Sequence, residues 1–141
     1  MPIAGIDHVA LPTGDPEACL RFYKSLGCRS LNEDDWRAGR RPTFSMIFGI
    51  NKINFHPGVV TDLRGPTAVP GCGDVCFVWA GGLPAIIELL DHAGIAIIYG
   101  PADRDGGRGD GKMHGVSVYV RDPDQNLIEF ICYGEAPVGQ I

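Results

Sequence analysis

The chain has 141 residues, of which 45% are hydrophobic and 21% are charged, a composition typical of one globular domain with its own core. Its net charge is −5, which disfavours a surface that follows nucleic-acid phosphates. No basic leader with a following apolar stretch is present near the start, and Glu88, Asp91 and His92 interrupt the most apolar later segment, so neither secretion nor membrane insertion is expected. Five cysteines without Cys-x-x-Cys spacing predict reduced, buried thiols in a cytoplasmic protein.

The first half of the chain has the pattern of a strand, a helix and three strands. A stretch rich in β-formers over residues 6–11, ended by Pro12, predicts the first strand. Asp15 and Pro16 are typical of a helix N-terminus, and an apolar stripe that stops at Gly27 predicts the helix that follows. Three more strands are expected over residues 28–31, 43–48 and 52–55.

The second half repeats this order after a connector over residues 57–71, which contains three prolines and three glycines. Strands are expected over residues 74–79, 95–99, 116–120 and 127–132, and a helix over residues 83–93. Residues 100–112 form a long, glycine-rich segment with Arg104, Arg108 and Lys112. This segment is expected to be either a solvated, mobile loop or a lid whose cations meet an anionic substrate.

A β-α-β-β-β pattern written twice predicts an α+β fold of two modules that form a curved mixed sheet around a cleft. The expected organisation is a single domain with module one at 1–56, the connector at 57–71, module two at 72–133 and a tail at 134–141. Laying one module over the other places His8 opposite Asp74 and Asn54 opposite Glu129.

Side-chain alternation gives each module one apolar face and one face with polar groups in the middle of strands. The polar set expected to line the cleft is His8, Asn54, His56, Asp74 and Glu129. Carboxylates and imidazoles inside strands are costly to desolvate unless a charge compensates them. A divalent cation would do so, and a hard donor set without a thiolate pair favours Fe, Mn, Ni, Mg or a catalytic Zn ion. Cys76 lies beside Asp74 and is expected to be a buried thiol rather than a nucleophile.

Three segments resemble the vicinal oxygen chelate superfamily, which includes glyoxalase I, extradiol dioxygenases, fosfomycin-resistance enzymes and bleomycin-binding proteins. They are Ile-Asp-His-Val-Ala-Leu at residues 6–11, the helix with Arg-Phe-Tyr at 21–23, and Arg-Asp-Pro-Asp-Gln-Asn-Leu-Ile-Glu-Phe at 121–130. Residues 52–56 and 73–77 are further similar to the glyoxalase-domain-containing branch. The resemblance covers nearly the whole chain.

The resemblance implies metal ligands at His8, Asp74 and Glu129, with Asn54 at the position of a fourth ligand in glyoxalase I. Asp74 stands where the family usually has a histidine, and Asn54 where glyoxalase I has a glutamate, which disfavours lactoylglutathione lyase activity. Two ligand sets stay open, one with Asp74 and one with His56 beside His8 and Glu129. The carboxylate of Asp74 or Glu129 that is not bound to metal would move a proton.

The function expected from these residues is a metal-dependent, glyoxalase-like lyase or isomerase, or a dioxygenase. It would chelate two adjacent oxygens of a small, anionic molecule and stabilise the oxyanion or enolate. Substrate contacts are expected from Asn54, Arg104, Arg108, His114 and Tyr119. The alternative is a metal-free small-molecule binding or resistance protein of the bleomycin-binding type, and a third possibility is a scaffold with an inert cleft. A homodimer is expected, with modules paired within one chain or across a swapped dimer.

Overall fold

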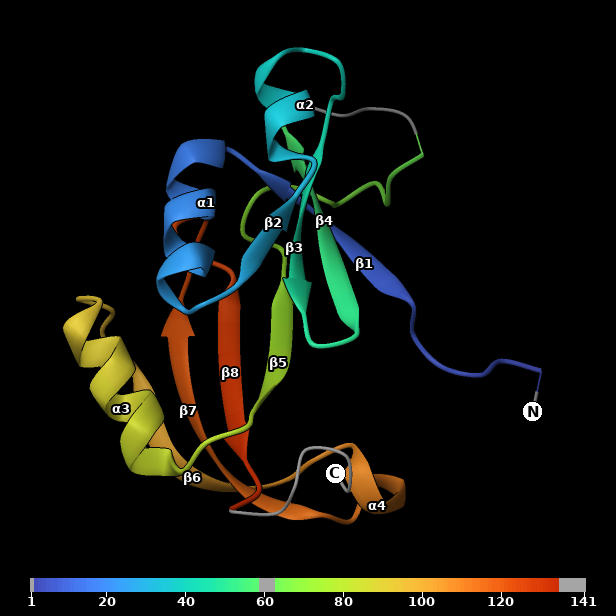
Figure 1. Cartoon of the computed structure of the whole chain (residues 1–141). Coiled ribbons are helices and arrows are strands. Elements are labelled where there is room, and N and C mark those ends of the chain that lie inside the picture. Colours follow the sequence, from blue (N-terminus) through green and yellow to red (C-terminus); the bar gives the residue numbers. More distant parts are fainter. Residues whose placement is uncertain (1, 59–62, 135–141) are drawn as a thin grey trace. The chain divides into compact units, whose positions relative to one another are not determined.

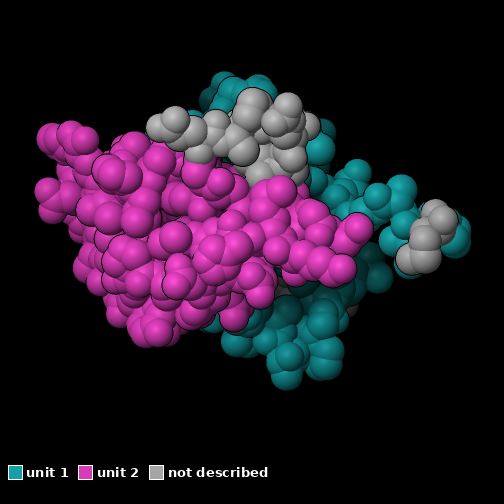
Figure 2. All heavy atoms as spheres, turned by 90° about the horizontal axis from the view of Figure 1, so that it is seen from below, with its two compact units in different colours: residues 1–73, 123–125 teal, residues 74–122, 126–141 magenta. Residues whose placement is uncertain are grey.

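The computed structural model describes residues 2–58 and 63–134 and confirms the α+β class, with two four-stranded mixed sheets (Figure 1). The chain divides into two compact units, coloured separately in Figure 2. Unit 1 comprises residues 1–73 and 123–125, and unit 2 comprises residues 74–122 and 126–141. Over the described residues, no helix combines the length and apolar character that crossing a membrane requires.

Unit 1 contains one sheet with the strand order β1-β4-β3-β2, in which only the β1–β4 pair is parallel. Its elements are β1 (His8–Thr13), α1 (Pro16–Ser25), β2 (Arg29–Leu31), α2 (Glu33–Arg37), β3 (Phe44–Phe48) and β4 (Asn51–Pro57). Helix α1 begins as predicted, because the Asp15 side chain accepts a hydrogen bond from the Ala18 amide at 3.0 Å. Its buried Tyr23 packs on Phe55 with ring centroids 5.2 Å apart.

Unit 2 repeats this arrangement with the strand order β5-β8-β7-β6, in which only the β5–β8 pair is parallel. Its elements are β5 (Asp74–Trp79), α3 (Leu83–His92), β6 (Tyr99–Asp105), α4 (Arg108–Gly111), β7 (His114–Arg121) and β8 (Leu127–Cys132). Ile86 and Leu90 of α3 are fully buried, as are Val118 of β7 and Ile128 of β8. These side chains form the core of the unit.

The strand register confirms the internal repeat. His8 lies opposite Lys52 in the first sheet, as Asp74 lies opposite Leu127 in the second. Two residues further along, Asn54 lies opposite Ala10. In the same way Glu129 lies opposite Cys76. The positions that sequence superposition paired are therefore equivalent in the two sheets.

Strands β1 and β6 depart most from their predicted ranges, and the predicted loop or lid is wrong. Strand β1 continues through Pro12, which an edge strand tolerates because the missing amide can face away from the ladder. Strand β6 covers Tyr99–Asp105 instead of residues 95–99, so most of the expected lid is a strand followed by the short helix α4. Gly100 and Pro101 fall at a register shift between Tyr99 and Ala102 on this edge strand, where a bulge accommodates them.

Helix α2 was not predicted, because its five residues are too few for a helical apolar period. Its Trp36 packs on Phe44 of β3 with ring centroids 5.1 Å apart. Of the expected connector at 57–71, Pro57 ends β4 and residues 63–71 contain only turns and irregular backbone, whereas residues 59–62 lie outside the described residues. Of the expected tail, residues 135–141 also lie outside them.

Candidate functional site

The predicted polar face of the second sheet is present in unit 2 and is organised around Glu129. Glu129 lies on β8, a strand that pairs with β5 on one side and β7 on the other. The Ser117 hydroxyl donates a hydrogen bond to its Oε2 atom at 2.6 Å. One carboxylate oxygen is thereby oriented by a neighbouring strand, an arrangement also seen for carboxylates that bind metals.

Tyr119 and Arg104 extend this arrangement towards the edge of the sheet. Tyr119 lies directly opposite Glu129, and its hydroxyl accepts a hydrogen bond from Arg104 Nε at 2.8 Å. Burial raises the pKa of Tyr119, the Arg104 guanidinium lowers it, and Glu129 raises it further. We call Arg104, Tyr119, Glu129 and Ser117 the polar row of unit 2.

Cys76 and Asp74 lie beside this row on β5. Cys76 is opposite Glu129 and is exposed, as is Cys72, so the prediction of buried thiols is wrong for these two and confirmed for Cys19 and Cys132. Partial burial of the Cys76 thiol, followed by the nearby Glu129 carboxylate, raises its pKa to about 12. A thiol that stays protonated at neutral pH is a poor nucleophile. Asp74 lies two residues earlier on the same face and is exposed.

In unit 1, His8 is oriented by its neighbour in sequence. Its Nδ1 atom lies 2.6 Å from Oδ1 of Asp7, and this contact lowers the pKa of the Asp7 carboxyl. A carboxylate on one ring nitrogen fixes the tautomer and leaves Nε2 available as a ligand atom. His8 therefore has the donor chemistry that a divalent metal ion requires.

Asn54 and His56 are engaged differently. The Ser45 hydroxyl donates to Asn54 Oδ1 at 2.7 Å, which leaves the amide Nδ2 as a donor for another group. His56 Nδ1 contacts the guanidinium Nη2 of Arg64. Burial, and then Arg64, lower the pKa of His56. Its Nδ1 must accept a hydrogen bond while Nε2 carries the remaining proton, so His56 is unsuited to bind a metal in this state.

The structure does not bring Arg108 or His114 together with the polar row. His114 alternates to the opposite face of β7 from Ser117 and Tyr119. There it lies 3.4 Å from Asp103 and 3.3 Å from Asp105. Arg108 begins helix α4, beyond the end of β6. Neither His114 nor Arg108 is therefore part of the polar row.

Four contributors to the site were not predicted: Asp7, Ser45, Tyr99 and Ser117. Asp7 precedes β1, and only its contact with the His8 ring in the structure identifies it. Ser45 lies directly opposite Asn54, which strand pairing reveals and the linear sequence does not. Tyr99 packs edge-on against Tyr119 with centroids 5.7 Å apart.

Among residues 2–58 and 63–134, no three His, Cys, Asp or Glu side chains are grouped to hold a metal ion. Individual donors nevertheless fit a hard divalent ion, because Asp7 orients His8 and Ser117 orients Glu129. The fit applies to these donor atoms one by one.

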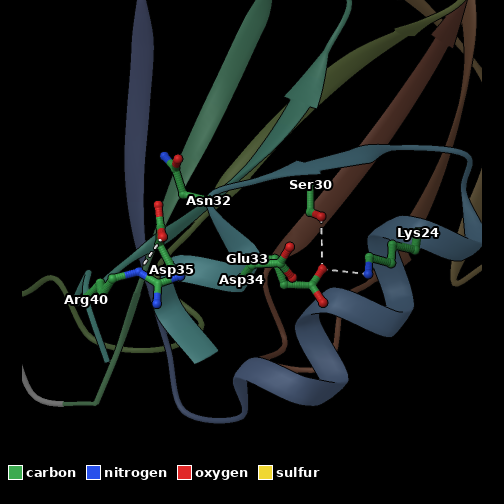
Figure 3. Close-up of a pocket in the computed structure, with 7 residues that line it drawn as sticks. All are labelled: Lys24, Ser30, Asn32, Glu33, Asp34, Asp35 and Arg40. Carbon is green, nitrogen blue, oxygen red and sulfur yellow. Dashed lines mark hydrogen bonds and ion pairs between the residues drawn. The ribbon is translucent and has the colours of Figure 1, made fainter. Parts of the chain in front are cut away.

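Two surface depressions lie apart from the predicted residues. One, of about 660 Å³, lies in unit 1 and is lined by Lys24, Ser30, Asn32, Glu33, Asp34, Asp35 and Arg40 (Figure 3). Glu33 is bound there by Lys24 and Ser30, and Arg40 by Asp35, so much of its charge is satisfied internally. The other, of about 580 Å³, is an apolar groove in unit 2 between α3 and residues 95–97.

No protein-family model matches the chain. It is 33% identical over 135 residues to virulence protein STM3117 of Salmonella typhimurium, covering 94% of this chain and 87% of that protein. The crystal structure of that protein has a TM-score of 0.81 at 32% identity and covers 94% of this chain and 99% of its own.

A second relative is the glyoxalase domain-containing protein RDO1 of Mycosarcoma maydis, 31% identical over 137 residues, which cover 96% of this chain and 72% of that protein. The fold is shared with lactoylglutathione lyase from Agrobacterium tumefaciens, with a TM-score of 0.66 at 17% identity over 94% of this chain and 96% of that one. The repeated module of the fold and the identity with these relatives lead to one conclusion. The chain belongs to the glyoxalase, or vicinal oxygen chelate, superfamily.

Proposed function

We propose that this chain is a metal-dependent enzyme of the glyoxalase or dioxygenase type that acts on a small, oxygenated, anionic molecule. The observation that carries the proposal is Glu129, a carboxylate in the middle of β8 whose Oε2 accepts a hydrogen bond from Ser117 at 2.6 Å. Such a carboxylate is oriented at one oxygen and can bind a ligand through the other.

His8 and Glu129 are the proposed metal ligands, and Asp74 is the proposed third. Of the two sets that the sequence leaves open, the contact of His56 with Arg64 favours the one with Asp74. A divalent ion bound there would act as a Lewis acid on two adjacent substrate oxygens. The proposal requires donors from both units, paired within one chain or across a homodimer.

The other residues are given roles by the contacts they already make. Asn54 would donate from Nδ2 to a substrate oxygen, because Ser45 already occupies its Oδ1. In a complex that leaves one of the two carboxylates, Asp74 or Glu129, off the metal, that carboxylate would take up and return the proton. Tyr119, which lies opposite Glu129, would orient the substrate by its hydroxyl group.

The alternative is a metal-free binding protein, and one observation favours it. The Arg104 guanidinium lies 5.7 Å from the Tyr99 ring centroid and 5.5 Å from that of Tyr119. Aromatic faces with a fixed cation can bind an anionic or planar molecule without a metal. This alternative uses the same face of unit 2 and gives Glu129 the role of a polar contact.

Metal titration distinguishes the two. Protein treated with a chelator is titrated with Mn²⁺, Ni²⁺ and Zn²⁺ by calorimetry, and we expect saturable binding of at least one ion. His8→Gln and Glu129→Gln should abolish it, and Ser117→Ala should weaken it by about tenfold, as loss of an outer-shell partner does. His92→Gln, at the exposed end of α3, is the matched control and should bind as the unchanged protein does.

The metal-dependent proposal fails if no ion binds, or if His8→Gln and Glu129→Gln bind as tightly as the His92 control. Thermal unfolding of each variant shows whether it is folded, so that loss of the fold is not taken for loss of a ligand. Retained binding of a small molecule in a chain that binds no ion would support the metal-free alternative.

A further inference from the structure

Arg104 is the one cation of the polar row, and its place on β6 was not expected from the sequence. Its register partner is Gly115, which has no side chain to compete for the same face. A Cβ atom at Gly115 would lie 2.7 Å from the Ile131 side chain, which therefore takes up the space beside this glycine. The Arg104 side chain extends along the sheet, and its Nε reaches the Tyr119 hydroxyl.

The guanidinium is fixed in position by neutral groups. Nε donates to the Tyr119 hydroxyl at 2.8 Å and Nη1 to the Asp103 carbonyl at 2.8 Å. The rings of Tyr99 and Tyr119, at an interplanar angle of 70°, form two sides of its surroundings. A side-chain hydrogen bond with Tyr99 adds to these two contacts, so three of the five N–H donors are used and two are left for an external acceptor.

No carboxylate among the described residues forms an ion pair with Arg104. The two acidic residues nearest in sequence, Asp103 and Asp105, lie on the other face of β6 and contact His114. Glu129 is separated from the guanidinium by Tyr119, which contacts both groups. A fixed arginine with neutral partners and free donors is suited to bind an oxyanion through two parallel hydrogen bonds.

We propose that Arg104 binds the carboxylate or phosphate-type oxyanion of the substrate, with Tyr99 and Tyr119 as its walls. The substrate would then have an anionic group at one end and its reacting oxygens at the other, with the Tyr119 hydroxyl between the two. This assignment rests on the proposed function only for what happens at Glu129. Binding of the anionic end needs no metal.

The test uses chelator-treated, full-length protein at constant ionic strength, with inorganic phosphate and benzoate as separate probes. Binding is followed in ¹⁵N-labelled protein by the side-chain Nε–Hε signal of Arg104 and, for the variants at this position, by the backbone amide signals of β6 and β7. We expect saturable shifts of the Arg104 signal with at least one probe, and the stronger probe identifies the kind of oxyanion. Arg104→Gln should abolish this binding, and Arg104→Lys should weaken it by about tenfold, because lysine keeps the charge and loses the planar fork.

Two further variants make the result specific. Arg29→Gln removes an arginine from β2, also an edge strand, and should leave both probes bound as before. Glu129→Gln should bind them at least as well, because it removes a nearby negative charge, while it abolishes metal binding if the proposed function is correct. The inference is overturned if the Arg104 signal does not shift, if Arg104→Gln binds like the unchanged protein, or if Arg29→Gln weakens binding equally. Success here with failure of the metal titration would retain the anion site in a metal-free binding protein.

Discussion

Glu129 and Asn54 occupy the same position in the two modules, and each accepts a hydrogen bond from a serine hydroxyl, at 2.6 Å and 2.7 Å respectively. The serine orients a side-chain oxygen in both cases. The difference lies in charge, since only Glu129 can be an anion, whereas the amide of Asn54 adds two N–H donors. Duplication thus provides two similar positions with unlike chemistry, one suited to a cation and one to a substrate oxygen.

Two histidines of the chain should titrate on opposite sides of the usual histidine pKa. Burial, followed by Arg64, lowers the pKa of His56. Hydrogen bonding to Asp105, with a further contribution from Asp103, raises the pKa of His114. We therefore expect pKa values below 6.5 for His56 and above 6.5 for His114, measured from the ring Cε1–Hε1 signals by NMR. His→Gln variants assign the signals, and Asp105→Asn should bring the pKa of His114 down.

These shifts have opposite effects on stability. His56 is harder to protonate in the folded chain than in the unfolded chain. Its contribution to the free energy of unfolding therefore falls as the pH drops below 6.5 and through the lowered pKa. The contribution of His114 to the free energy of unfolding is fully present below pH 6.5 and is lost as the pH rises through its raised pKa. A pKa of His56 at or above 6.5, or of His114 at or below it, would contradict the contacts described for these rings.

At the scale of elements, strands and helices with strong local signals could be predicted from the sequence. Strand β8 and helix α1 have clear apolar periods and clear end signals, and β8 has the predicted bounds. Strand β6 could not be predicted, because Gly100 and Pro101 are typical of loops and only the pairing with β7 explains them. Its misassignment also placed Arg104 in a lid instead of on the sheet.

The predicted site residues were found by strand position, and their partners were not. Alternation along β4 and β8 placed Asn54 and Glu129 on polar faces, and the structure agrees. Ser45 and Tyr99 depend on which strand lies next to which, and this is information about pairing and register. His114 was assigned by proximity in sequence to the glycine-rich segment, whereas alternation puts it on the other face of β7.

Glu33 at the start of α2 forms an ion pair with Lys24 of α1 (Figure 3), and a second one with Arg37 of its own helix. Its carboxylate binds Lys24 of α1 at 2.5 Å and Arg37 of α2 at 3.0 Å. The bond to Lys24, and then those to Ser30 and Arg37, lower the pKa of Glu33 to about 2 against the opposing effect of burial. Glu33→Gln should therefore lower the free energy of unfolding at pH 7 by about 1 kcal/mol, the upper range for a partly exposed ion pair.

Asp34→Asn is the matched control for this prediction, because no side-chain ion pair of Asp34 occurs among the described residues. It should change the free energy of unfolding by less than about 0.5 kcal/mol. In urea denaturation, the contribution of Glu33 should be present above pH 4.5 and be lost as the pH falls towards 2. Equal effects of the two substitutions at pH 7 would show that Glu33 does not join the helices energetically.

At the scale of the whole molecule, each of the two units is made of two separate segments of the chain. The β7–β8 turn at residues 123–125 belongs to unit 1, although the strands on both sides of it belong to unit 2. Within unit 1, the Gly14 amide donates to Asp124 Oδ1 at 2.8 Å. The end of the segment that precedes β5 also meets this turn, since a Cβ atom at Gly71 would lie 2.7 Å from the Asp124 carbonyl oxygen.

Substitution of Gly71 therefore tests the contact between the segment that precedes β5 and the turn at residues 123–125. Its φ of +91° is strained for any L side chain, and the carbonyl leaves no room for a methyl group. Gly71→Ala should lower the free energy of unfolding by about 1–3 kcal/mol, whereas Gly65→Ala, with no atom within 4 Å, should have little effect or stabilise by less than about 1 kcal/mol. Calorimetry measures the transition midpoints of both variants, and we expect the lower midpoint for Gly71→Ala. Similar midpoints for the two variants would contradict a tight contact between Gly71 and the turn at residues 123–125.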